Sequence, residues 1–240
     1  MAGNHTIAAP IVLTAGGLTG NVESTISTLT ISGVIGQTAM AGLSNNGTGT
    51  LELDGLNTYT GVTTLNGGTL AVQTLANGGV PSGIGASSNA TSNLVFNGGS
   101  LRYLGAGNST DRLFTLGPSG GTIRSSGTGP LNFTNPGALA LQASNMSTTL
   151  TLSGNNTGAN TFAPIIVEMC IRDSFDTNGN NVTIANAIGN NGAGNLTKVG
   201  NGILALLGNN TYTGGTVVNQ GTLNFNSLAS FCLLYTSRCV

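Results

Sequence analysis

Two stretches of the chain repeat each other without an insertion or a deletion. Residues 30–73 and 183–226 align at one constant offset. Their best-matching parts are GTGTLELDGLNTYTGVTTLNGGTLAVQ at 47–73 and GNGILALLGNNTYTGGTVVNQGTLNFN at 200–226. The pattern that both contain is L-x-L-x-G-x-N-T-Y-T-G-x-T-x-x-N-x-G-T-L. Repetition of a unit of this size predicts a repeat architecture, in which each unit packs on its neighbours.

The rest of the chain has the same character. A weaker third copy at residues 149–157 matches only the L-x-L-x-G-x-N-T opening. The middle of the chain lacks the motif but contains similar short apolar segments separated by turn residues, such as Asn97-Gly98-Gly99. We therefore expect residues 1–231 to form one array.

Short alternating segments indicate strands rather than helices. Residues 50–53, 69–72, 149–152 and 222–225 each place apolar side chains at every second position, as a strand with one buried face requires. Glycine is abundant, with 39 residues, and no run of helix-forming residues extends for three turns. The chain is predicted to be all-β.

Composition distinguishes two all-β architectures. A β-sandwich uses varied strands, whereas a parallel solenoid stacks like residues into ladders. Charged residues make up only 5% of this chain, against about 25% in an average soluble domain. Stacked charges of one sign repel, but stacked Asn and Thr side chains can hydrogen-bond along a ladder. These features favour the solenoid.

The motif resembles the autotransporter-associated β-strand repeat of bacterial autotransporter passenger domains. Residues 194–202 also resemble the L-x-K-x-G-x-G segment that precedes the family's motif. The first copy departs from it, because Asn45 stands where the second copy has Lys198. The lysine is therefore not required by both copies.

The resemblance implies both a fold and a location. It implies a right-handed parallel β-helix that is exported and displayed at the surface of a Gram-negative-type bacterium or secreted from it. Export would use a C-terminal β-barrel outside this chain, and that barrel would be the only link to a membrane. Passengers of this family often serve adhesion, and the repeat is associated with passenger export and folding. No signal peptide is visible at the first residues, so we expect the natural N-terminus to lie elsewhere.

Charge and residue types argue against several functions. The net charge is -1, so no basic surface is expected to bind nucleic acid. His5 is the only histidine, and no nucleophile or carboxylate can be assigned to it. Glu52 and Asp54 share one side of a strand, as paired carboxylates of glycosidases do, but Ala205 and Leu207 replace them in the second copy. The periodic Asp of calcium-binding β-roll repeats is missing. We expect no catalytic, cofactor or metal site.

The repeated aromatic and amide residues have two interpretations each. Tyr59 and Tyr212 are either stacking platforms for a glycan or residues that pack over the solenoid core, and we favour packing. Asn57 and Asn210 are either ligand-binding residues or residues that close turns and stack in ladders, and we favour the structural role.

The offset also predicts which side chains form the core. Alternation allows only one phase of each strand to face inward, and the shared leucines mark that phase. We expect both copies to have the same local structure and the leucines to be buried. They are Leu51, Leu53 and Leu70 in the first copy and Leu204, Leu206 and Leu223 in the second.

Three functions remain open from the sequence. The favoured one is a structural or adhesive surface passenger, with glycans, matrix or other cells as possible partners. The alternatives are a β-helix polysaccharide-degrading enzyme and a glycan-binding or other binding module, cytosolic or phage-tail-like. An enzyme of that kind needs clustered acids, often with calcium, and this chain has only seven acidic residues.

Two short islands differ from everything around them. Residues 169–174 (MCIRDS) and 232–240 (CLLYTSRCV) contain all three cysteines. Their back-translation matches the two orientations of a transposon end that is used to tag sequencing libraries. We therefore predict that both islands derive from a sequencing adapter and do not belong to the natural fold, the alternative being an ordinary protein with three cysteines.

Overall fold

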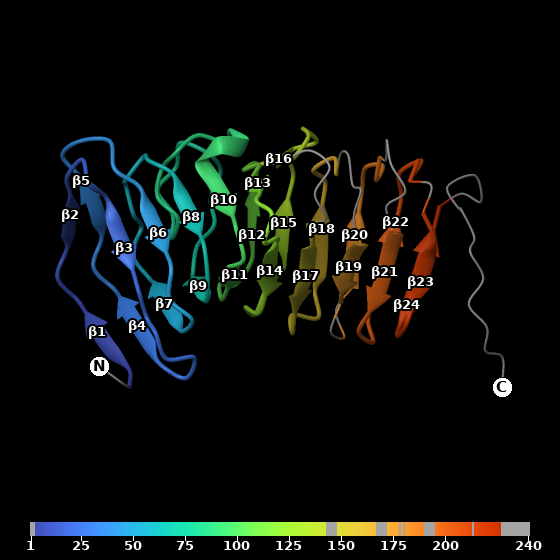
Figure 1. Cartoon of the computed structure of the whole chain (residues 1–240), viewed down its shortest axis with the longest axis horizontal. Helices are drawn as coiled ribbons and strands as arrows, with labels where there is room; N and C mark the ends of the chain where they lie inside the picture. The colour runs from blue at the N-terminus through green and yellow to red at the C-terminus, as the bar shows by residue number, and fades with distance from the viewer. Residues whose placement is uncertain are drawn as a thin grey trace.

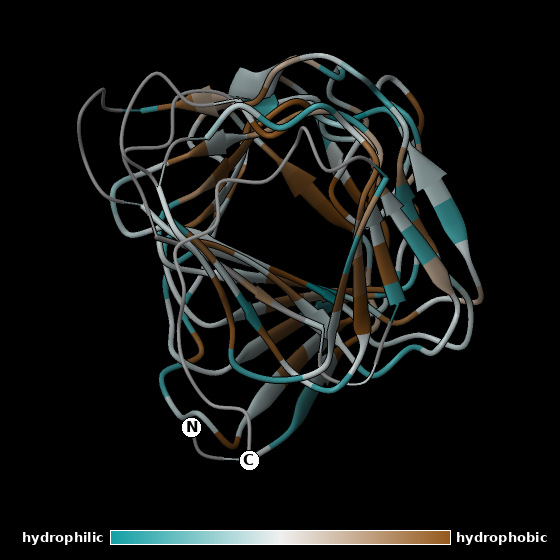
Figure 2. Ribbon diagram, turned by 90° about the vertical axis from the view of Figure 1, so that its right-hand side faces the viewer, coloured by the Kyte–Doolittle hydropathy of each residue, from teal (hydrophilic) through white to brown (hydrophobic). Residues whose placement is uncertain are grey.

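The protein is a long β-solenoid, shown in Figure 1 from the side and in Figure 2 along its axis. The computed structural model describes residues 3–142, 148–166, 172–177, 179, 181–189, 195–212 and 214–226. The strands stack from one end of a rod to the other in chain order, and the chain makes about nine turns. Among the described residues the only helix is the three-residue η1 (Thr91–Asn93), and no helix is long enough to cross a membrane.

Every pair of described strands is parallel, and each strand inside a sheet pairs with strands of the preceding and following coils, whereas the strands at the ends of a sheet have one partner. Every turn of the chain therefore adds one strand to each of several sheets, which confirms the predicted parallel solenoid. Sheet 1 consists of β1 (His5–Ile7), β4 (Thr28–Ile31), β7 (Thr50–Leu53), β9 (Thr69–Val72), β11 (Ser100–Tyr103), β14 (Gly121–Ser125) and β17 (Leu150–Gly154). Sheet 2 consists of β3 (Leu18–Gly20), β6 (Leu43–Asn45), β8 (Thr63–Leu65), β10 (Leu94–Phe96), β13 (Thr115–Leu116) and β16 (Ala140–Leu141).

The remaining strands form three further sheets. Sheet 3 consists of β12 (Asn108–Thr110), β15 (Leu131–Phe133), β18 (Ala159–Phe162), β20 (Asn181–Ile184), β22 (Ile203–Leu206) and β24 (Thr222–Phe225). A three-stranded sheet of β19 (Arg172–Asp176), β21 (Asn195–Val199) and β23 (Thr216–Val218) follows sheet 1, because β19 lies beside β17. A two-stranded sheet joins β2 (Ile11–Leu13) and β5 (Ile35–Gln37).

The two repeat copies have the same local structure, as predicted, but they lie on different faces of the solenoid. Strands β7, β8 and β9 of the first copy begin and end at the residues that the offset assigns to β22, β23 and β24. Strands β7 and β9 belong to sheet 1, whereas β22 and β24 belong to sheet 3. The second copy is therefore turned by one face around the axis relative to the first.

Leucines of successive coils stack into a continuous interior ladder. In sheet 1 the register places Leu51 beside Leu70 and Leu70 beside Leu101, and each of the three is fully buried. Of the six leucines predicted to be buried, five are, and Leu223 is only partly buried. The prediction for Leu223 is wrong because it lies on β24, the last described strand of sheet 3, whose one described neighbour is β22.

Aromatic rings fill the centre of the solenoid. Phe114 lies between Phe96 and Phe133 with ring centroids at 5.1 and 6.1 Å, in edge-to-face contacts. Phe162 continues the stack at 5.6 Å from Phe133. Offset and edge contacts of this kind add to the free energy gained from burial alone. Rings from sheet 2 and sheet 3 thus meet in one core.

Asparagine side chains stack along one corner, as the ladder hypothesis predicts. Asn66 Nδ2 donates to Asn46 Oδ1 at 2.8 Å, and Asn97 Nδ2 approaches Asn66 Oδ1 at 3.5 Å. The three residues follow β6, β8 and β10 of successive coils. Of the two predicted adapter islands, residues 169–171 and 232–240 lie outside the described residues, and residues 172–174 form part of β19.

Candidate functional site: the repeated hydrogen-bond unit

The motif asparagine links neighbouring coils through its side-chain amide. Asn57 Oδ1 accepts a hydrogen bond from the backbone N of Ile35 in the preceding coil, at 2.8 Å, and Asn57 Nδ2 donates to Gly83 O in the following loop, at 3.0 Å. In the second copy, Asn210 Oδ1 accepts from Ile188 N at the same distance. Asn210 Nδ2 has no partner among the described residues. Both asparagines are buried, which confirms their structural role.

This difference between the copies predicts different costs of mutation. Asn57→Ala removes the partners of one buried N–H and one buried C=O, and an unsatisfied buried group costs about 1–3 kcal/mol. Asn210→Ala removes the described partner of only one N–H. We expect the free energy of unfolding to fall roughly twice as much for Asn57→Ala as for Asn210→Ala, measured by denaturant titration of both variants. Equal losses would contradict the assigned roles.

The motif tyrosine packs inside the solenoid and bonds to the motif threonine. Tyr59 Oη and Thr63 Oγ1 are 2.9 Å apart, and Tyr212 Oη and Thr216 Oγ1 are 2.7 Å apart. Tyr59 is fully buried and Tyr212 is 7% exposed, so neither ring is a platform for a ligand. Burial raises the pKa of Tyr59 well above its usual value, and its phenol stays protonated as a hydrogen-bonded core group.

Asn45 and Lys198 donate to equivalent backbone carbonyls through different functional groups. Asn45 Nδ2 donates to Gly67 O at 2.8 Å, and Lys198 Nζ donates to the matching carbonyl, Gln220 O, at 3.1 Å. The ammonium also reaches two carbonyl oxygens beside it, those of Val199 and Gly200, at 2.8 and 2.6 Å. Both side chains are buried. The only lysine is thus a structural group that holds backbone carbonyls, and an amide replaces it in the first copy.

The glycine of the shared N-x-G-T-L segment is required by its backbone. Gly68 has φ +53° and Gly221 has φ +76°, a conformation that L side chains rarely adopt. A Cβ atom at Gly68 would collide with Gly49 O, and one at Gly221 would collide with Gly200 O. This glycine turn therefore determines where the last strand of each copy, β9 or β24, begins.

A buried arginine anchors the long connection between β9 and β10, which sequence reasoning missed. Arg112 is 1% exposed. Its Nε donates to Ala76 O at 3.0 Å, Nη1 to Ser87 Oγ at 2.9 Å and Nη2 to Gly85 O at 3.0 Å. Burial lowers its pKa, although the nearby Tyr59 and Asp111 oppose the shift. The neighbouring Asp111 Oδ1 accepts from Gly78 N at 2.7 Å, so two adjacent side chains hold one loop.

The residues considered as candidate catalytic groups lie on the outside of the solenoid. His5 is exposed on β1, and Asp54 is exposed just after β7. Glu52 faces outward on β7, and Gln73 Nε2 lies 3.4 Å from its Oε1. In the part of the chain that the structure describes, no group of three His, Cys, Asp or Glu side chains is arranged to hold a metal ion. His5 on β1 is separated by β4 from Glu52 on β7.

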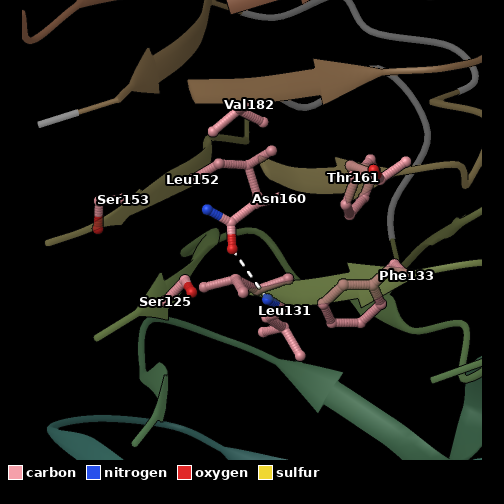
Figure 3. A pocket seen from close by; sticks show the side chains of 10 residues that line it. Ser125, Leu131, Phe133, Leu152, Ser153, Asn160, Thr161 and Val182 are labelled. Atoms are coloured by element: carbon pink, nitrogen blue, oxygen red, sulfur yellow. Dashed lines mark hydrogen bonds between the residues drawn. The ribbon is translucent and has the colours of Figure 1, made fainter. Parts of the chain in front are cut away.

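A small pocket of about 40 Å³ lies between sheet 1 and sheet 3 (Figure 3). Most of its lining is apolar, and Asn160 Oδ1 beside it accepts from Leu131 N at 2.9 Å. Ser125 Oγ also lines it and has no hydrogen-bond partner among the described residues. The space suits a water molecule or a packing gap, because ligand pockets are usually about 300–1,000 Å³.

The geometry of the unit agrees with its match to known proteins. Residues 43–72 and 196–225 match the family model of the passenger-associated-transport-repeat. Two segments of the chain are thus similar to this repeat, and each is 30 residues long. The residues matched begin at β6 in the first copy and within β21 in the second, so each includes the buried Asn or Lys, the motif Asn and the motif Tyr.

Two curated proteins are similar to this chain. The adhesin BmaC autotransporter of Brucella suis biovar 1 (strain 1330) is 50% identical over 155 residues, which cover 60% of this chain and 4% of the relative. An extracellular serine protease of Serratia marcescens is 62% identical over 40 residues, or 16% of this chain and 4% of the relative. The chain spans only a small part of the length of the relatives it matches. No solved structure matches it.

These comparisons confirm the resemblance to autotransporter passengers with repeats. An autotransporter adhesin and an extracellular protease are both exported proteins. The chain's relatives therefore indicate a location at the cell surface or outside the cell.

Proposed function

We propose that this chain is a structural and adhesive segment of an autotransporter passenger at a bacterial surface, and that its repeats support export and folding. One observation carries the proposal. The two copies that match the repeat family share two hydrogen bonds: the motif Asn Oδ1 accepts from a backbone N of the preceding coil, and the motif Tyr bonds to the motif Thr. The adhesive part rests on the similarity to an autotransporter adhesin over 155 residues.

The solenoid geometry suits such a role. Each coil contacts only its neighbours, so a coil can add its hydrogen bonds and its leucines to the preceding one as the chain emerges. The repeated unit supplies both kinds of contact. A rod of stacked coils also holds its outer residues far from the membrane on a stiff support.

Within this proposal the chain binds rather than catalyses. Its only histidine is exposed on β1, and Glu52 and Asp54 lie on the outside of the solenoid. Buried polar residues such as Arg112 and Lys198 are occupied by backbone carbonyls. The protease relative matches over 40 residues, which is too short to carry an enzymatic activity to this chain.

The export function can be tested by placing the chain in an autotransporter export system instead of its native passenger. We expect the chain to reach the surface of intact cells, where added protease degrades it. A matched variant with residues 200–226 shuffled in order keeps the composition but loses the repeat. Surface display of the shuffled variant should fall several-fold, and undiminished display would overturn the role of the repeat.

The adhesive function needs a separate measurement on the same cells. Cells that display the chain should bind to host-cell monolayers more than cells that display a non-adhesive passenger of similar length. Efficient display without added adhesion would overturn the adhesive part of the proposal and leave the export part standing.

A further inference from the structure

One outward face of the solenoid carries an unbroken ladder of hydroxyl groups. On sheet 1 the register aligns six residues that point outward from successive coils. None of their hydroxyls makes a hydrogen bond to another described residue. At about 4.8 Å per strand, the ladder extends for roughly 24 Å along the axis. The six are Thr28, Thr50, Thr69, Ser100, Thr122 and Thr151.

Two arginines stand side by side next to this ladder. Arg102 and Arg124 are direct partners in the register of β11 and β14, two residues from Ser100 and Thr122 on the same side of their strands. Like charges placed directly opposite each other destabilise a sheet. Neither arginine forms an ion pair with a described residue, and Arg102 Nε is buried without a hydrogen-bond partner. The pair thus has unused donors and an uncompensated double charge.

We propose that the outer face of sheet 1 binds an acidic polysaccharide that runs along the solenoid axis. Arg102 and Arg124 hold one of its sulfate or carboxylate groups, and the Thr and Ser ladder bonds to its hydroxyls. Guanidinium groups match such anions because they donate in a planar fork, and hydroxyl groups both donate and accept. This inference deepens the proposed adhesive function by naming a ligand class and a site.

The balance of groups favours a polysaccharide over a nucleic acid. Nucleic acids carry a phosphate on every nucleotide, and proteins bind them by neutralising several phosphates at once. This face offers two cations beside six neutral hydroxyls, and Glu52 lies in the arginine row on the far side of Ala71. A polymer with many hydroxyls and few charges fits that arrangement.

The site can be tested with the purified 240-residue chain and labelled oligosaccharides. The probes are a heparin oligosaccharide with sulfates, a hyaluronan oligosaccharide with carboxylates only, a neutral chitin oligosaccharide and double-stranded DNA. We expect one or both acidic sugars to bind. Comparison of heparin with hyaluronan shows whether the site prefers sulfate or carboxylate groups. Arg102→Gln/Arg124→Gln should weaken that binding roughly tenfold to a hundredfold, because charge-assisted hydrogen bonds are lost. Glu52→Gln should not weaken it.

Two control variants distinguish binding at this site from a general effect of the protein's net charge. Thr19→Asp/Ser109→Asp on other sheets makes the chain as negative as the arginine double variant, and it should retain binding. Arg102→Lys/Arg124→Lys keeps the charge but loses the fork, and it should bind less tightly than the natural chain. Equal loss in the aspartate control, DNA binding as tight as sugar binding, or no binding to either acidic sugar would overturn the inference. Loss of sugar binding with cell adhesion intact would overturn this site alone.

Discussion

Leu70→Ala is expected to lower the free energy of unfolding by about 2–5 kcal/mol, and Leu223→Ala by about 1 kcal/mol. The two leucines occupy the same position of the two repeat copies. Leu70 is fully buried between the leucines of two neighbouring coils, so its truncation leaves a cavity that stacked strands on both sides cannot collapse into. Leu223 has a described neighbour on one side only and is partly buried.

Denaturant unfolding of both variants, with hydrogen exchange of individual coils, measures this difference. The loss of protection in Leu70→Ala should centre on β7, β9 and β11, because each coil contacts only its neighbours. If Leu223→Ala lowers the free energy of unfolding as much as Leu70→Ala does, burial in the described coils does not determine the effect of the truncation.

Arg112→Met is expected to destabilise the protein by about 3 kcal/mol or more and to release the connection between β9 and β10. Methionine fills much of the same volume but donates no hydrogen bond. The substitution therefore removes three hydrogen bonds of a charged group and leaves Ser87 Oγ without its partner, whereas Ala76 O keeps Thr110 Oγ1 as a donor and Gly85 O keeps Ser82 Oγ. A hydrogen bond to a charged group contributes about 1.5–3 kcal/mol.

Arg112→Lys is the matched control for this prediction. It keeps a positive charge but has no planar fork, so it should be intermediate in stability. Hydrogen exchange at Gly78 and Gly85, compared with exchange in β14, reports whether the loop is released before the coils unfold. Unchanged loop protection in Arg112→Met would show that Asp111 and the backbone bonds of the loop are sufficient to hold it.

The repeat allowed much of the fold to be predicted, because its residues carry short-range information. Alternating leucines defined the inward phase of β7 and β22, and the shared N-x-G turn placed the start of β9 and β24. The motif Asn and Tyr were recognised as structural because both copies retain them beside turns. Their bonding partners were not predicted, since Ile35 and Gly83 belong to neighbouring coils.

Features that depend on the register of distant coils were not predictable from the sequence. Arg102 and Arg124 are 22 positions apart, and only the length of the intervening coil makes them neighbours. Arg112 is a charged residue whose burial depends on a loop about 30 residues earlier in the chain. The reduced burial of Leu223 follows from its place on β24 rather than from its motif.

The second copy lies one face further around the solenoid axis than the first, and this rotation determines how the two repeats can contact a partner. Thr58 and Thr211 occupy matching exposed positions of the motif, but the first lies beside β5 and the second beside Ile188, at a different side of the rod. One flat receptor surface laid along the rod can therefore contact this position in only one of the copies. Two receptors approaching from different directions can each engage one copy at the same time.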